Sequence, residues 1–461
     1  MKTTLPVKIG NTYTMTITGI GSNGEGVGRI NNFTVFVPYA LPGEQLDVTI
    51  QTSKKNYAIG KIIRIITTSP QRIAPRCGLY YECGGCQLQH LSYDAQLKIK
   101  QQQVKDAVER IGKQKNLLIH PTLGAKQPWN YRNKMQFPIG MDKKRVILGC
   151  FSQGSHNIVD TRDCYIQKET NNNIANAIRD AVQKLGISIY DEDKHIGTLR
   201  HIVGRVSETG DCMVILVTAT KDLHHSKELV KLLRQRLPKL ASVQQNIQTY
   251  RNNVIMGRET HLLWGKPSIK DSLGTLTFHI SPRSFFQVNT SQAAVLYQKA
   301  LEYANLTGHE TVIDAYCGTG TITLFLAQKA RKVYGIEIVK PAILDAQKNA
   351  RDNHVKNAEF IVGDATIVMP QLYKKGVYPD VVVVDPPRAG CTPTVLKTFA
   401  NMHPKRIVYV SCNPASLARD IAILADLGYK TEQIQPVDMF PQTYHVETVC
   451  LMTAKSSGKK Q

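Results

Sequence analysis

The chain has 461 residues and a formal net charge of +22 at pH 7. This length exceeds the usual size of one domain, so we expect two or three domains. The positive excess indicates a polyanionic partner. The sequence has neither an apolar run long enough to span a bilayer nor the apolar segment of a signal peptide, which excludes an integral membrane protein and predicts a cytoplasmic location. There, the ten cysteines are expected to be metal ligands, catalytic groups or core residues rather than disulfides.

Short strand-like runs separated by glycines and other turn residues occupy the first 66 residues. The segments that read as strands are Tyr13–Thr18, Phe33–Pro38, Leu46–Ile50 and Ala58–Ile65. Strands of this length and spacing predict a small β-barrel, an architecture that often binds RNA.

A cysteine cluster follows the predicted barrel. Cys77, Cys83 and Cys86 are separated by five and two residues, and Cys164 could supply a fourth thiol. Four thiolates suit either an iron–sulfur cluster or zinc, and the spacing leaves both open. His90 is a rival ligand, although a histidine at such a position is more typical of a loop or core.

The middle of the chain has a mixed pattern. Residues 92–111 carry apolar side chains at helical spacing. Further along, Arg145–Phe151 and Met213–Ala219 resemble strands, and Asn172–Leu185 and Ser226–Leu237 resemble helices. We therefore expect a mixed α+β central domain.

Strands and helices alternate from residue 285 onward. The predicted strands are Thr311–Asp314, Val333–Glu337, Ala358–Val362, Val381–Asp385 and Arg406–Ser411. This rhythm predicts a mostly parallel α/β sheet of the Rossmann-like kind, which binds ligands at the carboxyl ends of its strands.

A cofactor turn follows the first strand of this sheet. Asp314 ends the strand, and the turn Cys-Gly-Thr-Gly leads into a helix. Glycines let the backbone approach a ligand closely. Glu337 ends the second strand, where an acid typically accepts hydrogen bonds from a ribose, and Asp364 could lie beside an adenine. A dinucleotide oxidoreductase would need G-x-G-x-x-G, so the turn favours S-adenosylmethionine.

Two side chains near the carboxyl end of the chain suit methylation of a uracil ring through a covalent adduct. Uracil C5 is a poor nucleophile until a thiolate adds to C6, and a base must afterwards remove the C5 proton. Cys412, in Ser-Cys-Asn-Pro, can supply the thiolate, and Glu447 the base. Asp385 could bind the ring N–H or O4 region, with Arg388 nearby. The alternative for Cys412 is a buried structural thiol, and the alternative for Glu447 is a solvated acid.

Together these motifs resemble the RNA 5-methyluridine (uracil-C5) methyltransferase family, in the branch that modifies 23S ribosomal RNA. The matching features are a TRAM-like barrel, the four cysteines, and the segments Ser284–Asn289, Asp314–Gly320, Asp385–Arg388, Ser411–Pro414 and His445–Glu447. The resemblance implies S-adenosylmethionine contacts from Gln287, Tyr316, Glu337 and Asp385, a nucleophilic Cys412 and a proton-abstracting Glu447. It also implies a [4Fe-4S] cluster on Cys77, Cys83, Cys86 and Cys164.

The resemblance further implies a domain organisation and a partner. We expect a TRAM-like RNA-binding barrel over residues 1–68, a central domain with the iron–sulfur cluster over 69–280, and an S-adenosylmethionine-dependent methyltransferase domain over 281–461. The helix within 91–112 should pack on the methyltransferase domain. The expected partner is 23S ribosomal RNA, bound by a monomer without membrane association. Transfer-RNA members of the family usually lack both barrel and cluster.

Three other functions stay open. The same chemistry could act on transfer RNA. Formation of 5-methylcytidine usually involves a further cysteine in a Pro-Cys pair, whereas Arg388 follows the prolines here and Cys391 is displaced. The chain could also be a non-catalytic RNA-binding or assembly factor, against which Cys412 and Glu447 argue.

Overall fold

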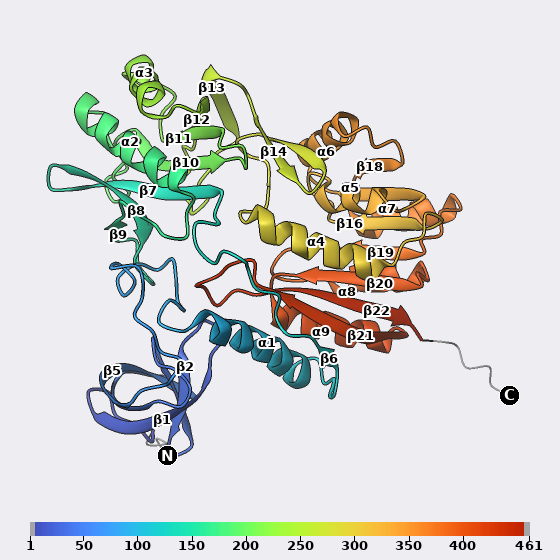
Figure 1. The fold of residues 1–461 in the computed structure, drawn as a ribbon, viewed down its shortest axis with the longest axis horizontal. Coiled ribbons are helices and arrows are strands. Elements are labelled where there is room, and N and C mark those ends of the chain that lie inside the picture. Colours follow the sequence, from blue (N-terminus) through green and yellow to red (C-terminus); the bar gives the residue numbers. More distant parts are fainter. Residues whose placement is uncertain (1–4, 456–461) are drawn as a thin grey trace.

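The computed structural model describes residues 5–455 and arranges them around a closed barrel, two large sheets and a two-stranded hairpin (Figure 1). The amino-terminal barrel, the central sheet and the carboxyl-terminal sheet occupy separate regions of the ribbon. Within residues 5–455, no helix combines the length and apolar composition that crossing a membrane requires.

The amino-terminal unit is a closed barrel with strand order β1-β2-β3-β5-β4, which confirms the predicted small barrel. Strand β2 was not predicted, because its glycines resemble a turn. Gly26 and Gly28 lie inside it, and a Cβ at these positions would come within 2.7 Å of Ala40 and 2.4 Å of the Thr16 carbonyl oxygen, respectively. These glycines therefore allow close strand contact. The barrel strands are β1 (Thr12–Ile20), β2 (Gly26–Ile30), β3 (Phe33–Val37), β4 (Gln45–Ser53) and β5 (Tyr57–Thr67).

The central unit is a seven-stranded sheet with order β13-β12-β11-β10-β7-β8-β9. Every residue of β10 and β11 is buried, because helices cover one face and the rest of the molecule covers the other. Its strands are β7 (Lys134–Asp142), β8 (Arg145–Phe151), β9 (Ile158–Asp160), β10 (Leu199–Val206), β11 (Cys212–Thr218), β12 (Leu240–Ile247) and β13 (Glu259–Gly265); its helices are α2 (Glu169–Leu185) and α3 (Ser226–Arg236).

The carboxyl-terminal unit is an eight-stranded sheet with order β18-β17-β16-β19-β20-β22-β21-β6. The five neighbours from β18 to β20 are parallel, which confirms the predicted α/β fold. The strands are β16 (Thr311–Ala315), β17 (Lys332–Glu337), β18 (Ala358–Val362), β19 (Val381–Val384), β20 (Arg406–Ser411), β21 (Tyr429–Val437) and β22 (Glu447–Ala454).

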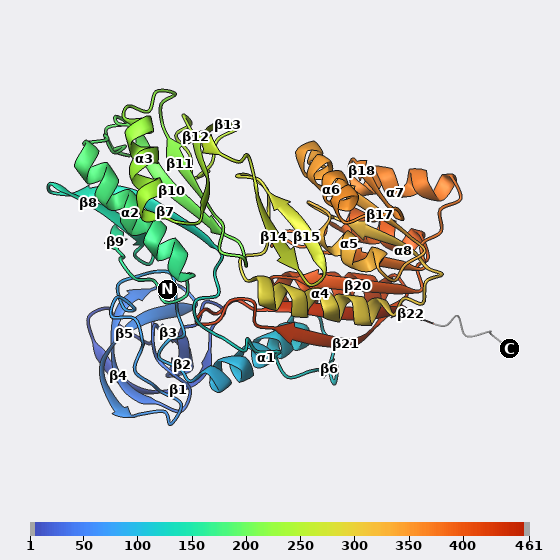
Figure 2. The same cartoon turned by 45° about the horizontal axis from the view of Figure 1, so that its top comes forward.

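Helices cover both faces of this sheet, and each face has its own apolar core. Helices α4 and α5 pack on one face, and α7, α8 and α9 on the other. Their bounds are α4 (Thr290–Ala304), α5 (Thr321–Ala327), α6 (Lys340–Asp352), α7 (Ala365–Lys374), α8 (Pro393–Asn401) and α9 (Pro414–Asp426). The hairpin of β14 (Ile269–Leu273) and β15 (Leu276–Ile280) lies between the central and carboxyl-terminal units (Figure 2).

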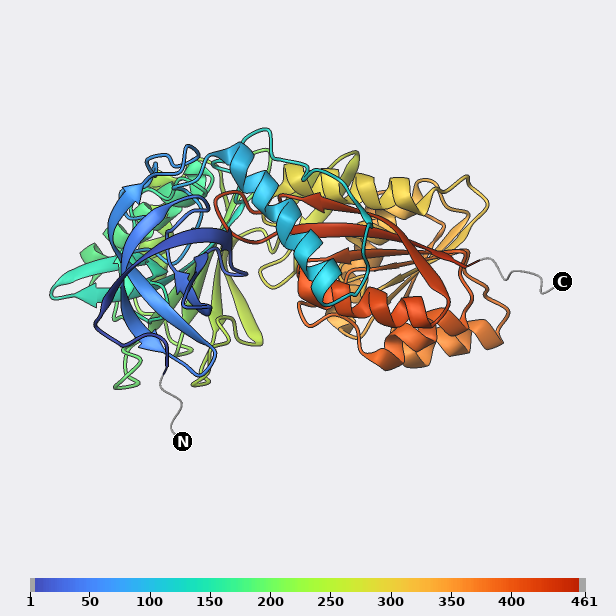
Figure 3. The same cartoon turned by 90° about the horizontal axis from the view of Figure 1, so that it is seen from below.

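A segment that follows the cysteine cluster returns to the carboxyl-terminal unit. Helix α1 (Tyr93–Arg110) buries Val104 and Val108 in the same core as α9, and β6 (Leu118–Ile119) pairs in parallel with β21. Figure 3 shows α1 running from the barrel side toward this sheet. The expectation that this helix packs on the methyltransferase domain is confirmed.

Candidate active site

Several predicted site residues lie at one edge of the carboxyl-terminal sheet. Strands β16, β17, β19 and β20 are parallel, so their carboxyl ends meet at this edge. Strand β22 runs antiparallel to β20 and therefore begins there. The residues that this topology places together are Tyr316, Glu337, Asp385, Cys412 and Glu447.

The turn after β16 has the backbone shape of a ligand cradle. Tyr316 adopts a positive φ of 65° and Gly320 one of 81°. A Cβ on Gly320 would come within 3.0 Å of both Phe360 and Ala346, so glycine is required there. The backbone N–H of Gly318 donates to Glu337 Oε2 at 3.3 Å, which ties the turn to the end of β17.

A buried carboxyl lies beneath this turn. Asp314 is fully buried, and its Oδ2 accepts a hydrogen bond from Thr323 at 2.5 Å. Its Oδ1 has no hydrogen-bond partner among the described residues. Burial raises the pKa of Asp314 to about 7. An unpaired buried oxygen of this kind suits a ligand donor.

Cys412 and Glu447 are brought together by strand register. Strands β20 and β22 pair Arg406 with Thr453 and, at their ends, Ser411 with Thr448. Cys412 directly follows the last paired residue of β20, and Glu447 is the first residue of β22, so both lie at the same end of this strand pair. The charge of Glu447 also acts on the Cys412 thiol. Nothing in the local sequence of either residue indicates that they lie close together.

Burial dominates the electrostatics of this pair. Burial, followed by the negative charge of Asp385, raises the pKa of Glu447 to about 8, while Arg388 acts in the opposite direction. Burial and then the charges of Glu447 and Asp385 raise the pKa of Cys412 to about 11, again opposed by Arg388. Burial also raises the pKa of Asp385 to about 6. Asp385, Cys412 and Glu447 therefore share a buried region in which the ionised form of each group is disfavoured.

Arg388 links the loops that carry these groups. Its guanidinium donates to Nδ1 of His445 at 2.8 Å, and its carbonyl oxygen accepts from the Asn413 side chain at 3.1 Å. Burial and the charge of Arg388 lower the pKa of His445 to about 4, so the imidazole is neutral and can accept this bond. Arg388 therefore stands beside both Cys412 and Glu447.

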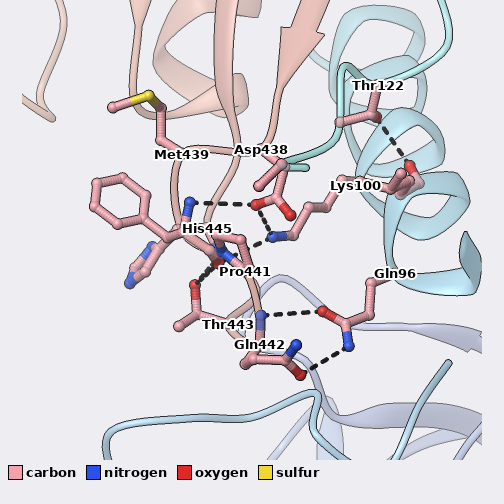
Figure 4. A network of polar contacts seen from close by, with 12 residues as sticks. Gln96, Lys100, Thr122, Asp438, Met439, Pro441, Gln442, Thr443 and His445 are labelled. Atoms are coloured by element: carbon pink, nitrogen blue, oxygen red, sulfur yellow. Dashed lines mark hydrogen bonds and ion pairs between the residues drawn. The ribbon is translucent and has the colours of Figure 1, made fainter. Parts of the chain in front are cut away.

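Helix α1 anchors the loop that precedes Glu447 (Figure 4). Lys100 Nζ lies 2.5 Å from Asp438 Oδ1, and both side chains are fully buried. Lys100 also donates to the carbonyl oxygen of Phe440 at 3.1 Å. The side chains of Gln96 and Gln442 are joined by a 3.0 Å hydrogen bond. Sequence reasoning missed this network, because its partners are more than 300 residues apart.

Gln287 and Tyr297 complete the surroundings of the site. Gln287 is buried, and its carbonyl oxygen accepts from Asn133 at 2.9 Å. Tyr297 of α4 is buried beside Gln287, and its pKa is raised by burial and then by the charges of Asp385 and Glu447. Tyr297 was not predicted; an aromatic residue on an apolar helix face resembles an ordinary core residue.

The four predicted metal ligands share one neighbourhood. Burial, then the charges of Cys164, Cys83 and Cys77, raises the pKa of Cys86 to about 12. Cys150, which sequence reasoning missed, lies beside Cys83 and acts on its pKa through a side-chain hydrogen bond. Within residues 5–455, however, no group of three or more His, Cys, Asp or Glu side chains is arranged tightly enough to hold a metal ion.

Known proteins match this chain over nearly its full length. The family described as "tRNA (Uracil-5-)-methyltransferase" matches residues 92–455, and the TRAM domain matches residues 6–63. An uncharacterized RNA methyltransferase of Clostridium tetani is 51% identical over 100% of both chains. Another from Halalkalibacterium halodurans is 49% identical over 98% of this chain and 99% of its own.

A solved structure shares the fold. The Pyrococcus abyssi tRNA (uracil-54, C5)-methyltransferase, solved in complex with S-adenosyl-L-homocysteine, superposes with a TM-score of 0.76 at 28% identity, covering 96% of this chain and 100% of its own. With the family match over more than half of the residues, the chain belongs to the tRNA (uracil-5-)-methyltransferase family and carries an amino-terminal TRAM domain.

Proposed function

We propose that this protein transfers a methyl group from S-adenosylmethionine to C5 of a uridine in RNA through a covalent adduct on Cys412. The observation that carries the proposal is the pairing of β20 with β22, which brings Cys412 and the buried carboxyl of Glu447 to the edge of the sheet that also bears the glycine turn. The reaction needs these three elements at one place.

The cofactor pocket in this proposal consists of Tyr316, Glu337, Gln287 and Asp385. The fit of a nucleoside cofactor is supported by the free Oδ1 of Asp314 among the described residues and by the close approach at Gly320. Glu337, at the end of β17, stands where an acid can accept from ribose hydroxyls. S-adenosylmethionine supplies an electrophilic methyl group when it is bound.

Each residue has a defined part in the proposed reaction. The Cys412 thiolate adds to uracil C6, which makes C5 a carbon nucleophile able to take the methyl group. The Glu447 carboxylate then removes the proton from C5, and the electron pair of that C–H bond restores the ring double bond as the thiolate leaves C6. The Arg388 cation favours both anions, since it opposes the rise in their pKa values.

We further propose a [4Fe-4S] cluster on Cys77, Cys83, Cys86 and Cys164. Four thiols of one neighbourhood are the donor set that such clusters use. The same thiols also suit zinc. No group of three or more potential ligands among residues 5–455 is arranged to hold a metal ion, so binding of either would require these thiols to move closer together. Iron and acid-labile sulfide analysis of anaerobically purified protein tests the assignment, and zinc without sulfide would contradict it.

The proposed substrate is 23S ribosomal RNA, supported by the presence of both a barrel and a cysteine cluster. Transfer RNA is the second candidate, because the Pyrococcus abyssi transfer-RNA enzyme is matched over its entire length by a superposition that covers 96% of this chain. A barrel alone therefore does not separate the two substrates.

Transfer of labelled methyl from S-adenosylmethionine to unmodified 23S ribosomal RNA and to unmodified transfer RNA separates them. We expect label in 5-methyluridine on the ribosomal RNA, absent with Cys412→Ala. Label on transfer RNA alone would keep the chemistry and change the substrate. RNA binding without any transfer would favour a non-catalytic RNA-binding factor.

A further inference from the structure

A cavity of about 260 Å³ lies in the central unit, away from the glycine turn, Cys412 and Glu447. It opens between the loop after β8, the loop before β10 and the loop after β12. Its lining combines the aromatic rings of Phe151 and Tyr190 with the basic side chains of Arg200 and Arg251 and with His195 and His201. No step of the proposed reaction uses these residues.

A bulge in β10 builds the floor of this cavity. The pairing of β10 with β11 shifts between Leu199 and His201, so that Arg200 is an extra residue in the strand. Leu199 and Ile202 both face the α2 core, and Arg200 and His201 both reach the cavity instead of pointing to opposite faces. A bulge of this kind re-aims side chains, and bulges are frequent beside functional sites.

Two buried polar atoms on this floor have no protein partner. Arg200 and His201 are each 7% exposed. Among the described residues, Nε of Arg200 and Nδ1 of His201 form no hydrogen bond. Arg200 is held in place by its Nη1, which donates to the carbonyl oxygens of Gln248 and Tyr250 at 2.9 Å each. The arrangement thus offers hydrogen-bonding atoms on a rigid support.

Aromatic groups line the same cavity as these atoms. The Arg200 guanidinium lies over the Tyr190 ring at 4.7 Å from its centroid, and the Tyr190 hydroxyl lies 3.0 Å from Nδ1 of His195. Phe151 and His156 form a stacked pair with centroids 5.2 Å apart and planes within 22°. Rings and guanidinium planes are the surfaces on which unstacked RNA bases rest, and polar atoms read the base edges.

The stacked pair of Phe151 and His156 also borders a second, larger cavity of about 680 Å³. That cavity is lined by the barrel residues Asn23 and Glu25 and by Tyr444, the neighbour of His445 in the loop before Glu447. The two cavities therefore adjoin at Phe151 and His156, and the second reaches the barrel and the loop before Glu447.

We propose that the central cavity binds one nucleobase of the RNA substrate, splayed out of its stack, at a fixed distance along the strand from the target uridine. The inference rests on the proposed RNA methylation and adds to it a second point of recognition. Such a site would select the RNA by a base outside the catalytic pocket, and it would hold the strand while the uridine is turned out.

The test measures equilibrium binding of fluorescein-labelled 23S ribosomal RNA and transfer RNA transcripts, so it does not depend on turnover. We expect Tyr190→Ala to weaken binding of the substrate transcript by about tenfold, in the range for loss of one stacked base. KM for RNA should rise in parallel, with kcat and cofactor affinity unchanged. Tyr250→Ala, on an exposed residue that does not line the cavity, is the matched control and should bind normally.

Arg251→Ala, with Arg234→Ala as control, distinguishes base recognition from attraction of phosphates. Arg234 stacks on Trp264 elsewhere in the same unit. A loss with Arg251→Ala but none with Tyr190→Ala would mean that the region attracts phosphates only, and would overturn the proposal. Ultraviolet cross-linking of the wild-type complex should join one defined nucleotide to Tyr190 or Phe151; cross-links confined to other peptides would also overturn it. A protein that binds RNA through this cavity but transfers no methyl group would refute the proposed reaction alone.

Discussion

At the scale of single residues, the proposed chemistry depends on a thiol and a carboxyl that are both more basic than usual. Removing either one should stop turnover at a different stage. Glu447→Gln keeps the hydrogen-bonding shape but cannot accept the C5 proton, so we expect a covalent protein–RNA adduct to accumulate in the presence of S-adenosylmethionine. Cys412→Ala should form none. Denaturing gels with labelled RNA measure the adduct, and normal turnover by Glu447→Gln would remove Glu447 from its role.

The raised pKa values predict the pH dependence of the reaction. Both groups act in their deprotonated forms, so activity is low where they are protonated and rises with pH. We expect kcat/KM to rise by about a hundredfold per pH unit below the pKa of Glu447 near 8, where both groups must lose a proton, and by about tenfold per pH unit above it as the Cys412 thiolate increases toward pH 11. A rate that is flat between pH 6 and 8 would contradict this account.

The Glu447→Gln variant supplies the matched control for that profile. Its rate of adduct formation should rise with pH without a break near 8. Because the charge of Glu447 raises the pKa of Cys412, the remaining break should move below about 11. A profile identical to that of the wild-type protein would show that Glu447 does not titrate in this range.

At the scale of elements, the buried ion pair between α1 and the loop before Glu447 should matter for stability. Lys100→Met leaves the buried Asp438 carboxyl without its cationic partner and deprives the Phe440 carbonyl of a donor. Breaking a buried pair in this way typically costs about 3–5 kcal/mol. We expect the unfolding midpoint of the carboxyl-terminal unit to fall clearly in urea, and methyl transfer to weaken with it.

Lys105→Met is the control on the same helix. Lys105 lies 4.0 Å from Glu109, and both side chains are exposed, so its loss should cost no more than about 1 kcal/mol. The double variant Lys100→Met with Asp438→Leu removes both charges and should recover part of the stability. Equal losses for Lys100→Met and Lys105→Met would contradict a structural role for the buried pair.

The helices and strands could be predicted from the sequence where they follow from a local pattern of apolar residues. The alternation of strands and helices after residue 285, the helix that follows the cysteine cluster and most barrel strands are local patterns of apolar residues. Strand β2 was not predicted, because glycines are typical of turns and occur inside a strand mainly where close strand contact requires them. The proximity of Cys412 to Glu447, the Lys100–Asp438 contact and the β10 bulge depend on register and packing between distant segments, which no local sequence pattern predicts.

At the scale of the whole molecule, the charge of +22 predicts how RNA binding responds to salt. Binding that neutralises phosphates releases counterions, and a protein with six to ten such contacts loses roughly 10³–10⁵ in affinity between 50 and 200 mM salt. We expect a steep fall for RNA and a nearly constant affinity for S-adenosylmethionine, whose pocket is a local feature of the carboxyl-terminal sheet. Calorimetry for the cofactor and fluorescence anisotropy for RNA measure the two. An RNA affinity that does not change with salt would contradict binding through electrostatic contacts with the phosphates.

The most direct test of uridine C5 methylation is release of hydrogen from that carbon. RNA transcribed with uridine tritiated at C5 is incubated with the protein and S-adenosylmethionine, and tritium in water is counted against methyl groups in the RNA. We predict one tritium released for each methyl group transferred. Neither Cys412→Ala nor Glu447→Gln should release tritium into water. Methyl transfer without tritium release would place the methyl group on another atom and contradict the proposed function.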